Sequence, residues 1–568
     1  MVSLETEHEN DYIKRIKEQF KDKIIGIRKL YDDQWLIITE KDYLRDVVRY
    51  LADINSSTEI HIATMVGSDE RPIRGKMSVT FWMNVIENGS SSFVGIRAYL
   101  DEDDLEYESI AQDLPGADWY EREIHEMLGI TPRNHPNLKR LILPDDWPEG
   151  AYPLRKDFNY SESPAKFPGY SFTYKDSSCA IVPLGPYHIS LDEPAHFRLY
   201  VKGEEIIGCD YKGFYSHRGI EKLAESRLTY EQVNFIAERI CGICGYTHST
   251  AYCQAMERIA GIDVPERAEY IRTLLLEIER IHSHLLWLGI ASHLVGLESG
   301  FMDAWRIRER IMWLAERLTG NRKTYGMNLI GGVRRDLLDY RKDLVMKTIE
   351  KVKEEYTQFV EKLKSNRSFI RRCEDIGVLP YDKARAYGVL GPTGRGSGRK
   401  IDTRRNHPYA SYKDVDFNIP LYKDGDVLSR ALVRIEEVLE SIWIIEQLID
   451  SMPGGDIIAE YTEIPQFSEG LGYTEAPRGE NVHYVMTGEK NVVYRFRVRA
   501  PTYANLQAVP KMLSGYTIAD APLIIASIDP CYSCTERVTI IDVKSGKRRT
   551  LSEDEFNMLS IKASRRRS

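Results

Sequence analysis

The chain has 568 residues, of which 42% are hydrophobic and 29% are charged, and its formal net charge is −9. Such a chain is long enough to bury a large core divided over two or three domains. Its negative charge gives no reason to expect a nucleic acid or an anionic membrane surface as a partner. No run of about 18 uncharged apolar residues occurs. The acidic N-terminus lacks an apolar stretch, so we expect no signal peptide and no spanning helix.

Residues 1–158 are predicted to form an N-terminal α/β domain. Short segments in which apolar and polar residues alternate predict strands at 24–28, 34–38, 59–66 and 77–86. Segments in which apolar residues recur every three or four positions predict helices at 12–23 and 41–51. Residues 119–130 form a further helix rich in Glu and Arg. That helix is expected either to present a solvated face or to lie at an interface.

Residues 159–178 are rich in Pro, Ser, Gly and Tyr and predict a linker or docking arm. The second domain, 179–537, is predicted to be mainly an α-helical bundle, so the whole chain belongs to the α+β class. It begins with a hairpin at 197–207, whose turn we place at Lys202-Gly203. Helical periodicity then covers 264–318, 336–364 and 427–448.

Residues 388–398 contain many glycines and predict a loop. The segment lacks the Gly-Lys-Ser/Thr ending of a phosphate-binding loop, and no clear strand precedes it. We therefore expect no nucleotide site there.

Two Cys-x-x-Cys pairs lie far apart in the sequence, Cys241 with Cys244 and Cys531 with Cys534. Two intervening residues let both thiolates reach one soft metal. One pair alone would indicate a redox motif or half a zinc site equally well, and two pairs could also form a four-cysteine zinc or iron–sulfur site. The remaining cysteines are scattered, and we expect buried apolar residues in a reducing compartment at Cys179, Cys209, Cys253 and Cys373.

The residues around the two pairs favour a more specific hypothesis. The strings Arg-x-Cys-Gly-x-Cys-x-x-x-His at 239–248 and Asp-Pro-Cys-x-x-Cys at 529–534 resemble the two active-site signatures of nickel–iron hydrogenase large subunits. The resemblance implies that Cys241 and Cys531 are terminal nickel ligands, and that Cys244 and Cys534 bridge nickel and iron. It also implies carbon monoxide and cyanide ligands on the iron. Four thiolates close together are electrostatically costly unless a metal offsets their charge.

Other strings resemble two subunits of respiratory complex I. Those at 119–130, 135–140 and 153–158 resemble its smaller hydrophilic subunit. Those at 217–222, 391–398 and 406–409 resemble its catalytic-core subunit, which is homologous to hydrogenase large subunits. Complex I has lost the four cysteines and binds quinone there, whereas this chain keeps them. The resemblance therefore implies a fused, membrane-associated, energy-converting hydrogenase of the formate hydrogenlyase type.

The same resemblance suggests residues beside the metals. Ala-Pro-Arg-Gly at 476–479 would place Arg478 over the centre as a donor to cyanide, the alternative being a surface salt bridge. The string at 185–194 resembles the segment that supplies a proton-transferring glutamate. We assign that role to Glu193, with Asp192 as competitor and a plain surface glutamate as the alternative. His188 would continue the relay. His248, four residues after Cys244, is expected to lie beside the ligands or to be a satisfied core histidine.

The resemblance implies an enzyme that interconverts protons, electrons and H2, evolving H2 in the cell. This chain has no spare cysteine cluster, so the iron–sulfur cluster is expected in a small-subunit partner. The other implied partners are a ferredoxin-like subunit, integral membrane subunits, formate dehydrogenase, nickel chaperones and a maturation protease, at the cytoplasmic face of the membrane. The alternatives are a complex I-like quinone- or sulfur-reducing module with a vestigial metal site, and a structural scaffold subunit.

The resemblance also implies that residues 538–568 are a C-terminal extension that is removed during maturation, with the cut after Arg537. The apolar run at 538–543 leaves an ordinary C-terminal hairpin as the alternative.

Overall fold

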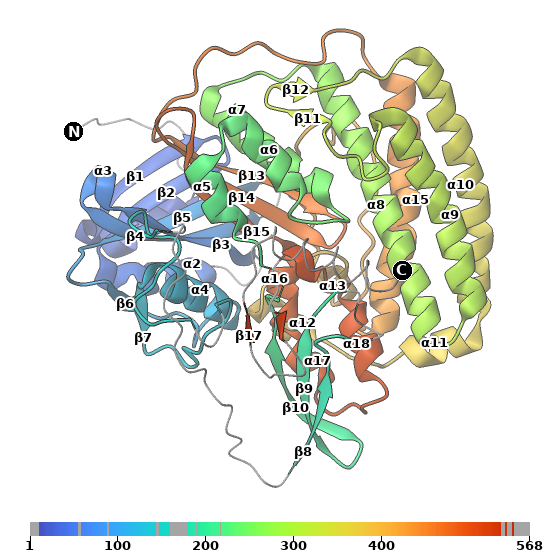
Figure 1. Ribbon diagram of the computed structural model, residues 1–568, viewed down its shortest axis with the longest axis horizontal. Helices are drawn as coiled ribbons and strands as arrows, with labels where there is room; N and C mark the ends of the chain where they lie inside the picture. The colour runs from blue at the N-terminus through green and yellow to red at the C-terminus, as the bar shows by residue number, and fades with distance from the viewer. Residues whose placement is uncertain are drawn as a thin grey trace.

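The computed structural model describes residues 11–54, 58–87, 90–143, 147–159, 179–188, 191, 193–215, 217–534, 540–541 and 548–549. Figure 1 shows an N-terminal sheet in blue, a bundle of long helices on the opposite side, and the small sheet β13–β15 between them. The α+β class is confirmed. The domain boundaries at 158, 178 and 537 remain predictions, and almost all of the predicted linker lies outside the described residues.

The N-terminal part is built on a five-stranded sheet of order β1-β2-β5-β4-β3, antiparallel except for the parallel pair β2–β5. The predicted helices are each shorter by a 3₁₀ turn, at 21–23 and at 41–43. The elements are α1 (Asp11–Phe20), β1 (Ile24–Tyr31), β2 (Gln34–Thr39), α2 (Leu44–Ala52), β3 (Glu59–Glu70), α3 (Arg71–Arg74), β4 (Lys76–Glu87), β5 (Ser90–Leu100), β6 (Glu106–Glu108), α4 (Asp118–Leu128) and β7 (Thr131–Arg133).

The predicted bundle consists of α8 (Glu266–Leu294), α9 (Glu298–Thr319), α10 (Asp339–Ser365) and α15 (Val427–Ser451). The apolar residues that recur along α8, such as Leu274, Ile278 and Ile281, are buried against these neighbours. Helix α15 begins where the Asp426 side chain accepts the Ser429 N–H at 2.7 Å. The described residues include no helix that is long and apolar enough to cross a membrane.

Shorter elements connect the two parts. They are β8 (Ala180–Leu184), β9 (His196–Lys202), β10 (Glu205–Lys212), α5 (Ile220–Arg227), α6 (Tyr230–Glu238), α7 (Gly245–Ala260), β11 (Asn328–Leu329), β12 (Gly332–Val333), α11 (Arg367–Cys373), α12 (Tyr381–Ala386), α13 (Gly391–Gly396), α14 (Thr403–Asn406), β13 (Glu469–Ala476), β14 (Gly479–Thr487), β15 (Val493–Arg499), α16 (Pro501–Leu506), α17 (Val509–Leu513) and α18 (Ala521–Ser527).

Three sequence predictions need correction. The β9–β10 turn is Gly203-Glu204, one residue later than expected, because β9 continues through Lys202. The glycine-rich segment contains the buried helix α13, because Gly391, Gly394 and Gly396 let its backbone pack where a side chain would clash. Of the four scattered cysteines, only Cys253 and Cys373 are buried, whereas Cys179 and Cys209 are partly exposed.

Helix α4 has no solvated face. Glu121, Arg122, Glu123 and Glu126 are all buried, although charged residues are rarely buried without partners. Glu123 explains the burial, because both of its carboxylate oxygens accept bonds from Arg497 of β15, at 2.5 and 2.8 Å. The helix is therefore an interface element, which was the second of the two expectations.

The C-terminal segment is described at only two places after residue 534. β16 (Ile540–Ile541) and β17 (Arg548–Arg549) pair antiparallel. This pairing is compatible with the hairpin alternative, and the predicted cleavage point at Arg537 lies outside the described residues.

Candidate metal centre

The fold brings the two cysteine pairs together. Cys241 lies in the connection between α6 and α7, and Cys531 follows α18, yet their Sγ atoms are 3.1 Å apart. A disulfide would require about 2.05 Å. Two thiolates that each lie about 2.3 Å from one metal are separated by roughly 3–4 Å, so this spacing suits a shared ion. Cys244 is buried in the same small cluster. The side chain of Cys534 lies outside the described residues.

Hydrogen bonds to the sulfur of Cys241 and to the backbone of Cys241 and Cys531 hold these cysteines in place. The N–H groups of Ile243 and Cys244 both donate to Cys241 Sγ, each at 3.2 Å. The Cys531 N–H donates to Thr502 Oγ1 at 3.2 Å, and the Tyr325 hydroxyl donates to the Cys241 carbonyl at 2.6 Å. Hydrogen bonds to sulfur favour the thiolate, which is the form that binds metals.

Arg478 occupies the turn between β13 and β14 and points toward these cysteines. Its guanidinium donates to the Asp529 backbone oxygen and to Asp529 Oδ1, both at 2.6 Å, and to Ser283 Oγ at 3.2 Å. Burial alone would lower the pKa of Arg478, but the negative charges of Asp529 and of the three cysteine thiolates outweigh burial and hold that pKa well above its ordinary value. The alternative of a surface salt bridge fails, because Arg478 is 2% exposed.

Glu193 lies against the second cysteine string. Its Oε2 accepts the Ser533 N–H at 2.5 Å, and its Oε1 accepts the Ser533 hydroxyl. Burial raises the pKa of Glu193 to about 7, the Ser533 N–H lowers it, and the nearby Cys241 raises it. A carboxyl group with such a pKa can exchange a proton near neutral pH. Glu193 contacts Ser533, the residue directly before Cys534.

The other predicted site residues lie in different surroundings. His248 is buried in α7, and its Nδ1 is 2.9 Å from Nε2 of His483 on β14. Burial lowers the pKa of His248 to about 4, so this ring is neutral in the physiological range. Cys244 precedes the first residue of α7, so its four-residue spacing from His248 does not by itself place the two side chains on one helix face. His188 is exposed, and Asp192 lies outside the described residues.

Sequence reasoning missed one face of α8. Glu279, His282 and Ser283 project from it at spacings of three and four residues. Glu279 accepts the N–H groups of Tyr246 and Thr247 at 2.9 and 3.0 Å and so caps α7. His282 Nε2 is 3.2 Å from the Ile243 carbonyl, between the first two cysteines. In the sequence, this set stands out only weakly, as a polar i, i+3, i+4 triplet on a helix that also carries other charged residues such as Arg272 and Glu277.

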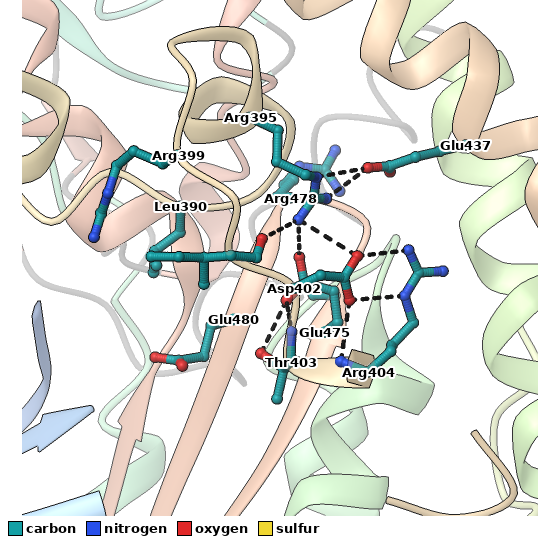
Figure 2. A network of polar contacts seen from close by, with 12 residues as sticks. Leu390, Arg395, Arg399, Asp402, Thr403, Arg404, Glu437, Glu475, Arg478 and Glu480 are labelled. Carbon is teal, nitrogen blue, oxygen red and sulfur yellow. Dashed lines mark hydrogen bonds and ion pairs between the residues drawn. The ribbon is translucent and has the colours of Figure 1, made fainter. Parts of the chain in front are cut away.

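A buried network of charged side chains lies next to Arg478 (Figure 2). Figure 2 shows Arg395 between Glu437 on one side and Asp402 and Glu475 on the other, with Arg404 beyond Asp402. Glu475 is three residues before Arg478 on the same hairpin. Its carboxylate also accepts the N–H and hydroxyl of Thr403, at 3.0 and 2.9 Å. Because these charges are fully buried, their mutual pairing is necessary.

The donor set fits a bimetallic thiolate centre. Three buried sulfurs converge, a buried cation faces them, and Asp529 Oδ2 beside them has no hydrogen-bond partner. Within the described ranges, no three His, Cys, Asp or Glu side chains already surround a point as a closed metal site would. The side chain of Cys534, the fourth candidate ligand, falls outside those ranges.

Comparisons with known proteins agree with this geometry. The family model for a nickel-dependent hydrogenase matches residues 218–299. The models for the 49 and 30 kDa subunits of respiratory-chain NADH dehydrogenase match 295–469 with 461–537, and 37–164.

Individual relatives match over nearly the full length. Formate hydrogenlyase subunit 5 of Escherichia coli (strain K12) is 42% identical over 97% of each chain. Hydrogenase-4 component G of the same strain is 40% identical, covering 97% of this chain and 96% of that protein. A chain from the structure of a membrane-bound sulfane sulfur reductase, an archaeal respiratory membrane complex, is 33% identical. It covers 64% of this chain and all of that one, with a TM-score of 0.61.

The fold and the cysteine cluster therefore define a nickel–iron hydrogenase large subunit joined to a complex I-type domain. The chain belongs to the hydrogenase family that includes formate hydrogenlyase subunit 5 and hydrogenase-4 component G. It is an oxidoreductase with a nickel–iron centre.

Proposed function

We propose that this chain is the H2-evolving catalytic subunit of a membrane-bound complex, and that Cys241, Cys244, Cys531 and Cys534 hold its nickel–iron centre. The observation that carries the proposal is the convergence of three buried cysteines from both ends of the catalytic domain beneath a buried arginine. The metals, with carbon monoxide and cyanide on the iron, would supply the two-electron chemistry of hydrogen.

The side chains around the centre have separate tasks in this proposal. Arg478 keeps its charge without solvent and offers N–H donors toward the metal ligands, while Asp529 and Ser283 fix its orientation. Glu193 takes and returns the proton through its carboxylate, because its pKa of about 7 suits both directions. Burial of the cysteines excludes water from the same place.

Electrons must come from outside this chain. Relatives are named as a hydrogenlyase, a membrane-bound hydrogenase and a respiratory membrane complex, which supports partners with iron–sulfur clusters and membrane subunits here. We propose an iron–sulfur small subunit, a ferredoxin-like subunit and formate dehydrogenase as the electron source, with the complex attached to the cytoplasmic face of the membrane.

The test is metal content combined with hydrogen chemistry. Purified complex should contain nickel and iron and should catalyse deuterium–proton exchange. Cys534→Ala should lose both nickel and exchange, because removing a bridging thiolate opens the centre. Cys373→Ala provides a matched control, because Cys373 is buried but lies outside the cysteine cluster. A nickel-free complex that reduces a quinone or polysulfide would instead support the complex I-like alternative.

A further inference from the structure

The hairpin β13–β14 connects the N-terminal sheet to the candidate metal centre. Its tip, residues 476–479, carries Arg478. One of its faces packs on α7, the helix that follows Cys244, and the other meets the N-terminal part of the chain. Figure 1 shows this hairpin lying between the blue sheet and α7. Contacts that the N-terminal part makes with this hairpin therefore act on the same element that carries Arg478.

The N-terminal part holds the hairpin at the end away from the tip. Both carboxylate oxygens of Glu469 accept bonds from Arg97, at 2.9 and 2.5 Å, and Oε1 also accepts a bond from Arg28 at 2.8 Å. The Gln34 amide donates to the Leu471 carbonyl and accepts the Leu471 N–H, both at 2.9 Å. A backbone bonded in both directions cannot slide along its strand without losing these bonds.

A second set of contacts holds the tip itself. Glu480, two residues after Arg478, is fully buried, and its Oε2 accepts the Asn84 amide at 2.6 Å. Its Oε1 is bonded to His61 Nε2 at 3.0 Å and to Arg499. Arg499 also donates to the Glu480 backbone oxygen and to the carbonyl of Ala63. Asn84, His61 and Ala63 all belong to the N-terminal sheet.

The charges make these contacts strong. Burial alone would raise the pKa of Glu480, but His61 and Arg499 outweigh burial and hold that pKa well below its usual range. Burial also lowers the pKa of His61, whose Nε2–H donates to the ionised carboxylate at 3.0 Å. An ionised buried group that loses a donor is strongly destabilised, so each donor constrains the position of Glu480.

The hairpin has no space to move away from these contacts. A Cβ on Gly472 would lie 1.8 Å from the Ala251 carbonyl of α7, so strand and helix backbones touch. Gly479 has φ +127°, and a Cβ there would lie 2.6 Å from the Gly391 nitrogen. Close packing on both sides transmits small displacements rather than absorbing them.

From these contacts we infer that the N-terminal domain positions the active-site arginine, with His61 and Asn84 as positioning residues that act on Arg478 through Glu480. The inference rests on the proposed function, because it takes Arg478 as part of the catalytic centre. It assigns to the fused domain a part in the chemistry beyond assembly of the complex.

The test uses the full complex and three variants. His61→Leu removes the donor, Asn84→Asp places a carboxylate against Glu480, and His61→Gln keeps an N–H donor. In the first two, backbone amide exchange in the peptide covering 474–482 should accelerate about tenfold, as expected for the loss of one buried hydrogen bond. H2 evolution should fall by a similar factor with nickel content unchanged, and His61→Gln should restore both.

Ser109→Ala is the matched control, because Ser109 is buried in the same domain and bonds Glu121 at 2.5 Å, away from the hairpin. It should change neither exchange at 474–482 nor turnover. The inference is overturned if His61→Leu and Asn84→Asp leave exchange at 474–482 at the parent rate. It is equally overturned if turnover falls only in proportion to lost nickel. Amide exchange is measured without hydrogen turnover, so a failure of the proposed function would show separately, as a nickel-free parent complex.

Discussion

At the scale of single residues, burial sets the chemistry of the carboxylates. Glu193 and Glu121 both have pKa values raised to about 7, and Glu279 has one raised to about 8, in each case chiefly by burial. Glu480 is buried as deeply as Glu121 and Glu279, but its pKa falls because a histidine and an arginine contact it. The partner, rather than the depth of burial, decides which carboxyl group holds a proton at pH 7.

Glu193→Gln tests the proton route. The variant keeps a hydrogen-bond acceptor for Ser533 but cannot titrate, so deuterium–proton exchange should fall at least about 100-fold with nickel content near normal. The parent exchange rate should change with pH around 7, where the Glu193 carboxyl titrates, and the variant should lose that inflection. Exchange at the parent rate in Glu193→Gln would move attention to Asp192 and His188.

Glu121 predicts part of the pH dependence of stability. Its folded-state pKa lies above the ordinary value of 4.5, so the folded chain binds this proton more tightly than the unfolded chain does. Its contribution is therefore complete below about pH 4.5 and is lost as pH rises through about 7. The loss amounts to about 3 kcal/mol. The melting temperature of Glu121→Gln should fall less than that of the parent between pH 5 and pH 8. Equal falls would contradict the assignment.

At the scale of elements, α8 organises the centre. One face of this helix caps α7 through Glu279, contacts the loop between Cys241 and Cys244 through His282, and supports Arg478 through Ser283. A helix buried along most of its length is a rigid support, which is what precise ligand placement requires.

Glu279→Ala should disturb this arrangement. It leaves the N–H groups of Tyr246 and Thr247 buried without an acceptor, at a cost of roughly 2–4 kcal/mol, and frees the start of α7 beside Cys244. We expect a lower melting temperature and weaker nickel retention during dialysis against a chelator. Glu279→Gln keeps an acceptor oxygen and should retain most of the nickel. Equal retention in the alanine variant would show that α7 holds its start without Glu279.

At the scale of the whole molecule, two sequence regions share one interface. The hairpin β13–β14 is bonded to the N-terminal sheet at Glu469, Leu471 and Glu480, and α4 is bonded to β15 through Glu123. Buried ion pairs across an interface lose their compensation when the parts separate. We therefore expect the N-terminal region to be required for a stable catalytic domain.

The predicted removal of residues 538–568 belongs to the step in which the metal centre is loaded. Cys531 and Cys534 lie close to the end of the chain, so a buried centre is most easily loaded while that end stays open. Intact-mass measurement of active protein should find a chain that ends at Arg537, whereas protein from nickel-starved cells should retain Ser568. Active, nickel-loaded protein that still carries Ser568 would show that the site closes without processing.

The sequence alone determined the elements whose signals are local. The periodicity of α8, α9, α10 and α15 and the alternation of β1 to β4 depend on neighbouring residues, so these predictions were confirmed to within a few residues. The two cysteine strings, Arg478 and Glu193 were recognisable because each stands in a distinctive short string.

Only the tertiary structure decided which distant residues meet. That Glu279 caps the helix after Cys244, and that His61 and Asn84 hold Glu480, depends on contacts between segments far apart in the chain. The burial of charged α4 and the helical α13 followed from partners that no local pattern contains. A common Glu, His or Asn carries no local mark of such a role, because its function arises from the geometry of the groups around it.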